Sequence, residues 1–594
     1  MVPYKHREKS DIVVVLTAVF FSILIAVIAL VFYGPRLSTN DDVLIKALLN
    51  GDISGSHETH IINGMFLFGA ILKPLYEING NVAWYDFLLF GLHIMVYLFL
   101  LIRVCQLTKG KKTGIRIVMI IISGLFITFL DFQYIILHQY TILATVTAAV
   151  GVFWLVTLRE ENRREKIADY SVIAVSVLLC LLMRIESFLM VLPVFALAFL
   201  YRMIRKANVS KVVFLLILAA AVSLVFIAEK SAYSTPEWKE FKKIHSERID
   251  IYDYYRFPSY DLAKEDFEKL GIERTDLYPL GEWDLGLFED YNANRMEPLS
   301  ELCKKYWEKE NELPLTQMWA IKYIIKKLIP KIFENPLWPA GWIMFLGTPF
   351  LLVWLIIKKQ YKKILFSVFS FLYMMVFSVY FIYRGRFPER VSYVLYFLII
   401  AFLTGIFASG KEEGKKKNSP DENDDNKKCA WKKIAGRITL AAATAVLIAG
   451  VGLRLYQTRN LLSEAKSKDA DWDAMNEYFL DHPENMYYIK TTTFSANGEE
   501  MFKKSTYEKN NFVRLGAWFV KSPIHERYLA IRGDETWKRI RTDENVYYVE
   551  DETAGTDWIE RFYEGRGISV DVTTADTVTL PSGRNILLIS IREK

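Results

Sequence analysis

Paired carboxylates follow the first of several apolar segments in this 594-residue chain. Asp41 and Asp42 stand in STNDDV, a few residues after the apolar segment 12–32. A carboxylate near a desolvated surface and beside a second carboxylate is expected to have a raised pKa, which suits a general base. The pair could equally end the preceding helix and bind water, and Asp42 stands where it could cap a short helix. Both residues are therefore catalytic candidates with a structural alternative.

Three arginines within seven residues form a second candidate, because the planar guanidinium binds phosphate oxygens bidentately. Arg384, Arg386 and Arg390 stand in YRGRFPER, between two apolar segments. This pattern favours a phosphate or pyrophosphate ligand, with anionic lipid headgroups as the alternative. Arg184 and Glu186 interrupt another apolar stretch, where they indicate either a ligand contact or a structural ion pair.

Other ionisable residues have weaker patterns. HETH places His57 and His60 three residues apart, without the i, i+4 spacing of a zinc-binding helix, so no metal site is predicted there. Asp131 and His138 lie between two apolar segments, where solvation of a loop is the expected role. The four cysteines have no CxxC or Cys/His spacing. The sequence has no Walker loop, GxSxG motif or Rossmann fingerprint, which disfavours ATP-driven transport and serine hydrolysis.

The elements that must position these residues are membrane-spanning helices. Hydrophobic residues make up 52% of the chain, more than in an ordinary soluble protein, which excludes disorder, a secreted mini-fold and a soluble enzyme. The net charge of +6 is small for this length and does not indicate nucleic-acid binding. A bilayer core needs about 20 apolar residues per helix. The predicted spans are 12–32, 84–101, 115–130, 140–158, two within 171–201, 212–228, 338–357, 364–383, 391–407 and 438–453.

Basic residues favour the cytoplasmic ends of membrane helices, and this rule orients the chain. Basic clusters both precede and follow 171–201, so this stretch must be a hairpin with Arg184 and Glu186 near its outer tip. The rule predicts about eleven spans in the plasma membrane, with the N-terminus in the cytoplasm and the C-terminal region outside. The arginines of YRGRFPER are an exception, because they fall on the outer side.

Two domains are predicted, a mainly α-helical transmembrane domain over 1–457 and an extracytoplasmic soluble α/β domain over 458–594. The first contains extracytoplasmic loops over 34–83 and 229–337 and a disordered cytoplasmic linker over 409–437. Within the larger loop, 315–333 has the pattern of an amphipathic interfacial helix. In the second domain, strands are predicted over 485–494, 545–550, 568–578 and 585–592, and helices over 471–480 and 556–563.

This arrangement resembles the GT-C superfamily of membrane glycosyltransferases. The likeness lies in the cytoplasmic N-terminus, about eleven spans, the acidic pair of Asn40-Asp41-Asp42, basic groups on later outer loops and a soluble domain after the last span. The stretches HSERIDIYDYYRFPSYD and LGIERTDLYPLGEW also resemble a segment of bacterial polytopic proteins grouped with such enzymes. The long motifs that several GT-C branches carry in later loops are not found.

The resemblance implies sugar transfer at the outer face from a polyprenyl-phosphate-linked sugar to a cell-envelope glycan, lipid or protein acceptor, among membrane lipids. In that family a first-loop Asp acts as the base or orients the acceptor, which implies Asp41 or Asp42, with Asp42 preferred. The implied ligands of the donor phosphate are Arg184, Arg384, Arg386 and Arg390. Further substrate contacts are expected from His57, His60, Glu186, Arg248, Asp253, Tyr254 and Tyr255. No cofactor is assigned, and dependence on a divalent metal stays open.

A transporter or flippase of a lipid-linked glycan is the alternative function. Such a protein needs charged groups along a path through the membrane. The predicted spans are almost free of mid-helix charge and the polar groups gather at one face, which favours chemistry at the surface. A scaffold whose spans only anchor the C-terminal domain ranks last, because an anchor needs far fewer spans.

Overall fold

The computed structural model describes residues 4–160, 162–281, 293–310, 322, 326, 329–330, 339–384, 386–409, 426–490, 492–494, 498–503, 511–532 and 536–594. Within these ranges, ten helices are long and apolar enough to cross a membrane, and Tyr140–Val156 is a further, shorter apolar helix. Together they match the predicted number of about eleven spans. The chain is therefore a multi-pass membrane protein.

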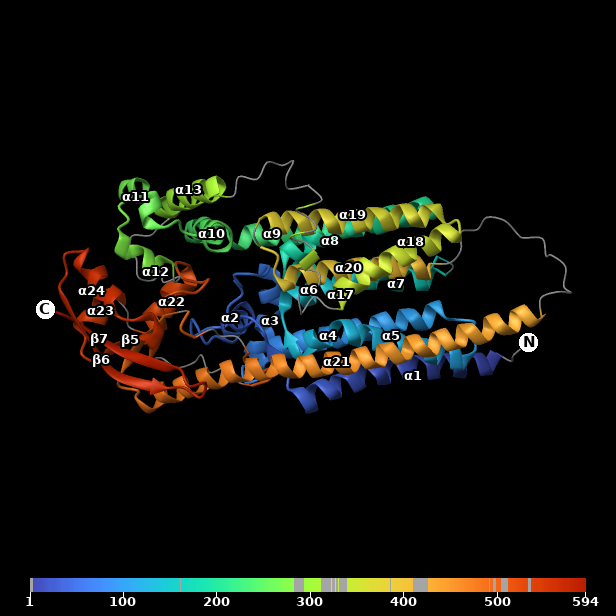
Figure 1. Cartoon of the computed structure of the whole chain (residues 1–594), viewed down its shortest axis with the longest axis horizontal. Helices are drawn as coiled ribbons and strands as arrows, with labels where there is room; N and C mark the ends of the chain where they lie inside the picture. Colours follow the sequence, from blue (N-terminus) through green and yellow to red (C-terminus); the bar gives the residue numbers. More distant parts are fainter. Residues whose placement is uncertain are drawn as a thin grey trace.

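The spans run back and forth along one bundle, with the C-terminal domain at one end, here called the domain end (Figure 1). They are α1 with the π-helical turn η1 (Tyr4–Ile28 and Ala29–Tyr33), α4 (Trp84–Leu107), α5 (Thr113–Ile136), α6 (Tyr140–Val156), α7 (Arg163–Met183), α8 (Ile185–Arg205), α9 (Val209–Ala232), α17, η6 and α18 (Ala340–Trp342, Ile343–Gly347 and Thr348–Ile357), α19 (Tyr361–Tyr383), α20 (Glu389–Ala408) and α21 (Asn426–Asp481).

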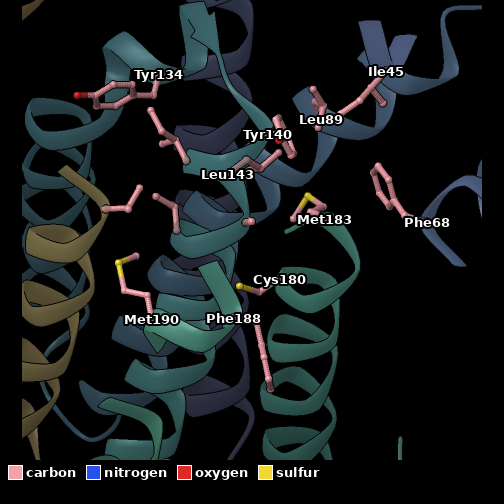
Figure 2. Close-up of a cluster of buried hydrophobic side chains, with 14 of the residues drawn as sticks. Ile45, Phe68, Leu89, Tyr134, Tyr140, Leu143, Cys180, Met183, Phe188 and Met190 are labelled. Carbon is pink, nitrogen blue, oxygen red and sulfur yellow. The ribbon is translucent and has the colours of Figure 1, made fainter. Parts of the chain in front are cut away.

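Helix α6 lies at the centre of the bundle. Every residue of α6 except Thr141 is buried, in keeping with its apolar and small side chains. Small residues let neighbouring helices approach closely. A side chain at Gly151 would place its Cβ 3.1 Å from the Cβ of Ser176 in α7. Figure 2 shows Tyr140 and Leu143 in the buried cluster that this packing forms with side chains of α7 and α8.

The predicted hairpin over 171–201 is confirmed as α7 and α8. Arg184 is both the C-cap of α7 and the N-cap of α8, and its backbone is extended. The prediction from flanking charge succeeded because the basic start of α7 and the basic end of α8 both lie at the end of the bundle opposite the domain end. The turn at Arg184 lies at the domain end (Figure 1).

Two short helices follow α1 at the domain end, α2 (Asn40–Asn50) and α3 (Phe66–Ile78). The backbone before α2 pairs with the start of the α5–α6 connection: β1 (Arg36–Leu37) is parallel to β2 (Leu137–His138). Thr39 is the N-cap of α2, and its side chain accepts a hydrogen bond from the backbone N–H of Asp42. The predicted capping role of Asp42 is therefore wrong, because this residue lies inside the first turn.

The larger loop forms a helical lobe that lies beside the C-terminal domain (Figure 1). Its elements are α10 (Pro236–Ile249), the π-helix η2 (Asp250–Tyr255), α11 (Tyr260–Lys269), the 3₁₀ turn η3 (Arg274–Asp276), α12 (Leu277–Gly281) and α13 (Ala293–Glu310). The predicted interfacial helix over 315–333 lies almost entirely outside the described residues.

The C-terminal domain is built on a five-stranded sheet of order β4-β3-β5-β7-β6. Strand β3 is parallel to β4 and β5, and β7 is antiparallel to β5 and β6. The strands are β3 (Met486–Ile489), β4 (Phe512–Arg514), β5 (Val546–Asp551), β6 (Val570–Thr579) and β7 (Asn585–Glu593). Helices α22 (Pro523–Arg532), α23 (Thr536–Thr542) and α24 (Asp557–Glu564) complete the domain, which confirms the predicted α/β architecture.

The last span does not end where the sequence predicted. Helix α21 begins at Asn426, within the predicted disordered linker, and continues to Asp481 in the C-terminal domain. It therefore includes both the last predicted span and the predicted helix over 471–480. Residues 410–425 of the linker lie outside the described residues.

Candidate functional site

Asp42 is fully buried at the domain end, with both carboxylate oxygens bonded to protein donors. The Thr39 hydroxyl donates to Oδ2 at 2.5 Å. Oδ1 accepts hydrogen bonds from the Tyr85 hydroxyl at 3.0 Å and from the Tyr140 backbone N–H at 2.9 Å. Burial raises the pKa of Asp42 to about 7, although these hydrogen bonds act in the opposite direction. The carboxyl group thus joins α2 to the first turns of α4 and α6.

Asp41 lies at the edge of this cluster and meets a different set of groups. Its Oδ1 accepts a hydrogen bond from the Asn63 side chain at 3.1 Å. Its Oδ2 lies 3.4 Å from the guanidinium of Arg390, which is 27% exposed. Asp41 itself is only 9% exposed, so Arg390 is the more accessible partner of this long contact.

Arg184 reaches the same place from the turn between α7 and α8. Its guanidinium donates to the hydroxyl of Tyr140 and, at 3.3 Å, to the backbone carbonyl of Asn63. Its Nε lies 2.7 Å from the carboxylate of Glu186, which is 64% exposed. Asn63 therefore contacts Asp41 through its side chain and Arg184 through its backbone, so two arginines flank one carboxylate.

The arginine segment after α19 contacts the Tyr-rich segment η2. Arg386 forms an ion pair with Asp253. The Arg384 guanidinium lies 4.8 Å from the ring centre of Tyr254 and 5.6 Å from that of Tyr255, a cation–π arrangement. Arg390 lies in the first turn of α20 and contacts Asp41, whereas Arg384 and Arg386 contact residues of the lobe.

Three of the predicted substrate-binding residues lie apart from this cluster. His57 Nδ1 pairs with the carbonyl of Leu49, and His60 stacks on Trp238. Arg248 is fully buried and donates to backbone carbonyls of the C-terminal domain, at 2.7 Å to Ala517. The expectation that Arg248 closes over a sugar is therefore wrong, since its guanidinium holds α10 against that domain.

A buried polar network that the sequence analysis missed lies beneath the arginine segment. His93 Nε2 pairs with Asp131 Oδ2 at 2.7 Å, and the Tyr393 hydroxyl donates to Asp131 Oδ1 at 2.7 Å. The ring of His138 lies 5.1 Å from that of His93. Asp131 and His138 are fully buried, so the expected loop solvation is wrong for both. His93 in the interior of a predicted span was the signal that could have indicated this network.

No metal centre can be assembled from the described residues. Within these ranges, no three His, Cys, Asp or Glu side chains converge as a ligand set. Glu58 of HETH instead pairs with Arg527 at 2.5 Å.

Comparison with known proteins leaves the family open. No protein-family model and no curated protein matches the sequence. Among solved structures, the chain is similar to ArnT from Cupriavidus metallidurans bound to undecaprenyl phosphate, with 11% identity and a TM-score of 0.38 over 97% of this chain and 98% of that chain. A likeness of this strength identifies neither a family nor an activity, so function must be inferred from the side chains.

Proposed function

We propose that the protein is a GT-C-type membrane glycosyltransferase that moves a sugar from a polyprenyl phosphate to an acceptor at the outer face of the plasma membrane. The observation that carries this proposal is Asp41, a nearly buried carboxylate that pairs with the partly exposed Arg390 and is joined to the partly exposed Arg184 through Asn63. A base beside paired phosphate ligands is the arrangement that glycosyl transfer from a lipid phosphate requires.

In the proposed reaction Asp41 accepts the proton of the acceptor hydroxyl. The acceptor oxygen forms a bond to the anomeric carbon, and the bond between that carbon and the phosphate oxygen breaks. The electron pair of the broken bond stays on the phosphate, which leaves as polyprenyl phosphate. Arg390 and Arg184 neutralise the negative charge that develops on the leaving group. Donor binding draws Arg390 away from its 3.4 Å contact and leaves the Asp41 carboxylate available as a base.

Asp42 has a positioning role in this proposal rather than that of the base. Its side chain has no exposed surface, and both of its oxygens accept hydrogen bonds. A general base must come within hydrogen-bond distance of the proton it takes. The preference for Asp42 is therefore replaced by one for Asp41, whose side chain is 9% exposed and pairs with the 27% exposed Arg390.

The Tyr-rich segment η2 forms the part of the proposed site that contacts the sugar and the acceptor. Arg384, Arg386 and Tyr254 lie together at the domain end, where an aromatic face and cations suit a sugar phosphate. Glu186 contributes a largely exposed carboxylate beside Arg184. The proposed acceptor is a glycan, lipid or protein of the cell envelope, and the C-terminal domain lies outside the cell with the site.

Ion pairs at the far end of the bundle favour an enzyme over a flippase. Arg103 and Asp169 are both fully buried and lie 3.0 Å apart. Glu160 is 2.7 Å from Arg202 and 2.6 Å from Lys211. Breaking one buried pair costs about 3–5 kcal/mol. Alternating access would have to open this end repeatedly, whereas a transferase that works at the domain end can keep it closed.

The proposal is tested with purified full-length protein in nanodiscs and a panel of undecaprenyl-phosphate hexoses and pentoses. The measurement is the release of undecaprenyl phosphate, with the Asp41→Asn variant as the matched control. Release that depends on Asp41 is the expected result. Movement of an intact donor across proteoliposome membranes, with no release from any donor, would establish the flippase instead.

A further inference from the structure

Residues 498–503 of the C-terminal domain, here called the clasp, lie against the segment that precedes α2. The backbone N–H of Leu37 donates to the carbonyl of Glu499 at 2.8 Å, and that of Gly498 donates back to Leu37 at 2.8 Å. The Arg36 guanidinium adds a hydrogen bond to the carbonyl of Gly498 at 2.6 Å. The clasp thus extends β1 as a further antiparallel partner, three residues before α2 begins.

Lys46 joins the clasp to α2 itself. It lies one helical turn after Asp42, on the same face of α2, and its side chain is 1% exposed. Its ammonium lies 2.9 Å from the carboxylate of Asp86 and 2.5 Å from that of Glu499. It also donates to the backbone carbonyl of Lys503 at 3.2 Å. These contacts occupy all three N–H groups of the ammonium, two of them with the clasp.

Lys46 and Asp42 both bind to the first turn of α4. Tyr85 and Asp86 are neighbours in the first turn of α4, and each bonds one residue of α2. Asp86 Oδ2 also accepts the backbone N–H of Phe502, at 2.8 Å. The bond from Tyr85 to Asp42 and the pair between Asp86 and Lys46 therefore form two adjacent links between α4 and α2, and the clasp completes the second.

The clasp is fitted closely between two membrane helices. Gly498 has a φ of +100°, and a Cβ there would lie 2.5 Å from the carbonyl oxygen of Ala465 in α21. A larger residue at this position would therefore push the clasp away from α21. At the other end, Phe502 has a φ of +68°. Its ring lies 4.9 Å from that of Phe87 and 5.7 Å from that of Phe90, both in α4. A non-glycine residue with positive φ persists where its surroundings compel it.

We propose that the clasp is a positioning device for the catalytic centre, in which Glu499 acts through Lys46 to set the position of α2 and its carboxylates. Catalysis falls steeply when a reacting group is misplaced by about an ångström, so a helix bearing the base needs such support. The C-terminal domain is then part of the catalytic unit rather than a separate binding module. This inference rests on the proposed function for its consequence in turnover, but its structural part does not.

The test compares Glu499→Gln with Lys503→Gln in full-length protein in nanodiscs. Both variants remove one charge from the clasp, but the Lys503 side chain is 57% exposed and its carbonyl is retained. Hydrogen–deuterium exchange of the peptide covering 40–50 is expected to be about tenfold faster in Glu499→Gln and unchanged in Lys503→Gln. Lys46→Met, which removes the ammonium, is expected to show the same acceleration.

Turnover provides the second measurement. In Glu499→Gln we expect kcat to fall by about tenfold or more, while the Kd for undecaprenyl phosphate changes by less than about twofold. A general loss of folding would instead reduce both binding and turnover. Unchanged exchange over 40–50 in Glu499→Gln and Lys46→Met overturns the inference. If no variant or native protein turns over any donor but exchange still accelerates, the proposed function fails and the structural role of the clasp stands.

Discussion

Replacing Asp42 with asparagine is expected to stabilise the protein at pH 8. The pKa of this carboxyl rises from its ordinary 3.8 to about 7 on folding, chiefly through burial. At about 1.4 kcal/mol per pH unit, a rise of about three units corresponds to about 4 kcal/mol. Because the folded state holds this proton more tightly than the unfolded chain does, the stability of the native protein falls as pH rises from about 4 to about 7. Above pH 7 the ionised, buried Asp42 carboxylate lowers the free energy of unfolding by this full amount.

Asparagine removes this cost while keeping the local hydrogen bonds. Its carbonyl oxygen can replace Oδ1, which accepts from Tyr85 and Tyr140, and its amide can donate to the Thr39 hydroxyl. Asp42→Asn is therefore expected to be more stable than the native protein at pH 8 by up to about 4 kcal/mol, with the difference vanishing near pH 4.

The assay is thermal unfolding in detergent between pH 4 and pH 8, followed by tryptophan fluorescence. Asp557→Asn is the control, because Asp557 is 88% exposed and its replacement removes the same charge without changing a buried group. A destabilised Asp42→Asn variant at pH 8, or a difference that does not shrink on acidification, would refute the reasoning. Either result would mean that the carboxylate is better solvated than its burial indicates.

Three other substitutions test separate parts of the structure. Arg390→Gln removes a proposed phosphate ligand and is expected to weaken undecaprenyl-phosphate binding by about 10–100-fold, measured by native mass spectrometry; Lys73→Gln on the exposed side of α3 should not. Arg248→Met leaves buried carbonyls of the C-terminal domain unpaired and should lower the free energy of unfolding by about 3 kcal/mol or more, measured by thermal unfolding. Unchanged stability with weaker donor binding would instead make Arg248 a substrate ligand. Arg103→Met removes one of the two arginines that pair with the buried Asp169 and should lower the melting temperature without changing the KM for a donor; a raised KM at unchanged stability would contradict the structural role.

Much of the fold was predictable because lipid contact requires long apolar helices. Hydropathy indicated the spans, and basic flanks indicated the hairpin at Arg184. The continuity of α21 was not predicted, because its apolar part is followed by charged residues such as Arg459 and Lys466. The helix continues through these residues, where hydropathy no longer indicates a span. The three-residue β4 and two-residue β1 and β2 are too short for alternation to be visible.

The candidate site was predictable in its charged groups but not in its partners. Asp41 and the arginines are rare ionisable residues beside apolar segments, which made them visible. Their neutral partners carry no such mark: Tyr85 and Tyr140 meet Asp42 from 43 and 98 positions away along the chain. Lys46 was equally invisible, because the carboxylate of Glu499 that pairs with it lies in another domain. Contacts of this kind follow from tertiary packing alone.

The division of roles between the two adjacent carboxylates is the central claim. The most direct measurement is kcat for Asp41→Asn and Asp42→Asn with the same undecaprenyl-phosphate sugar, at saturating donor and with donor binding confirmed for each. Loss of a general base costs about 10²–10⁴-fold in rate, so Asp41→Asn should fall by that factor. Asp42→Asn keeps its hydrogen bonds and should retain turnover within about tenfold. The reverse order, with Asp42→Asn inactive and Asp41→Asn active, would contradict the account.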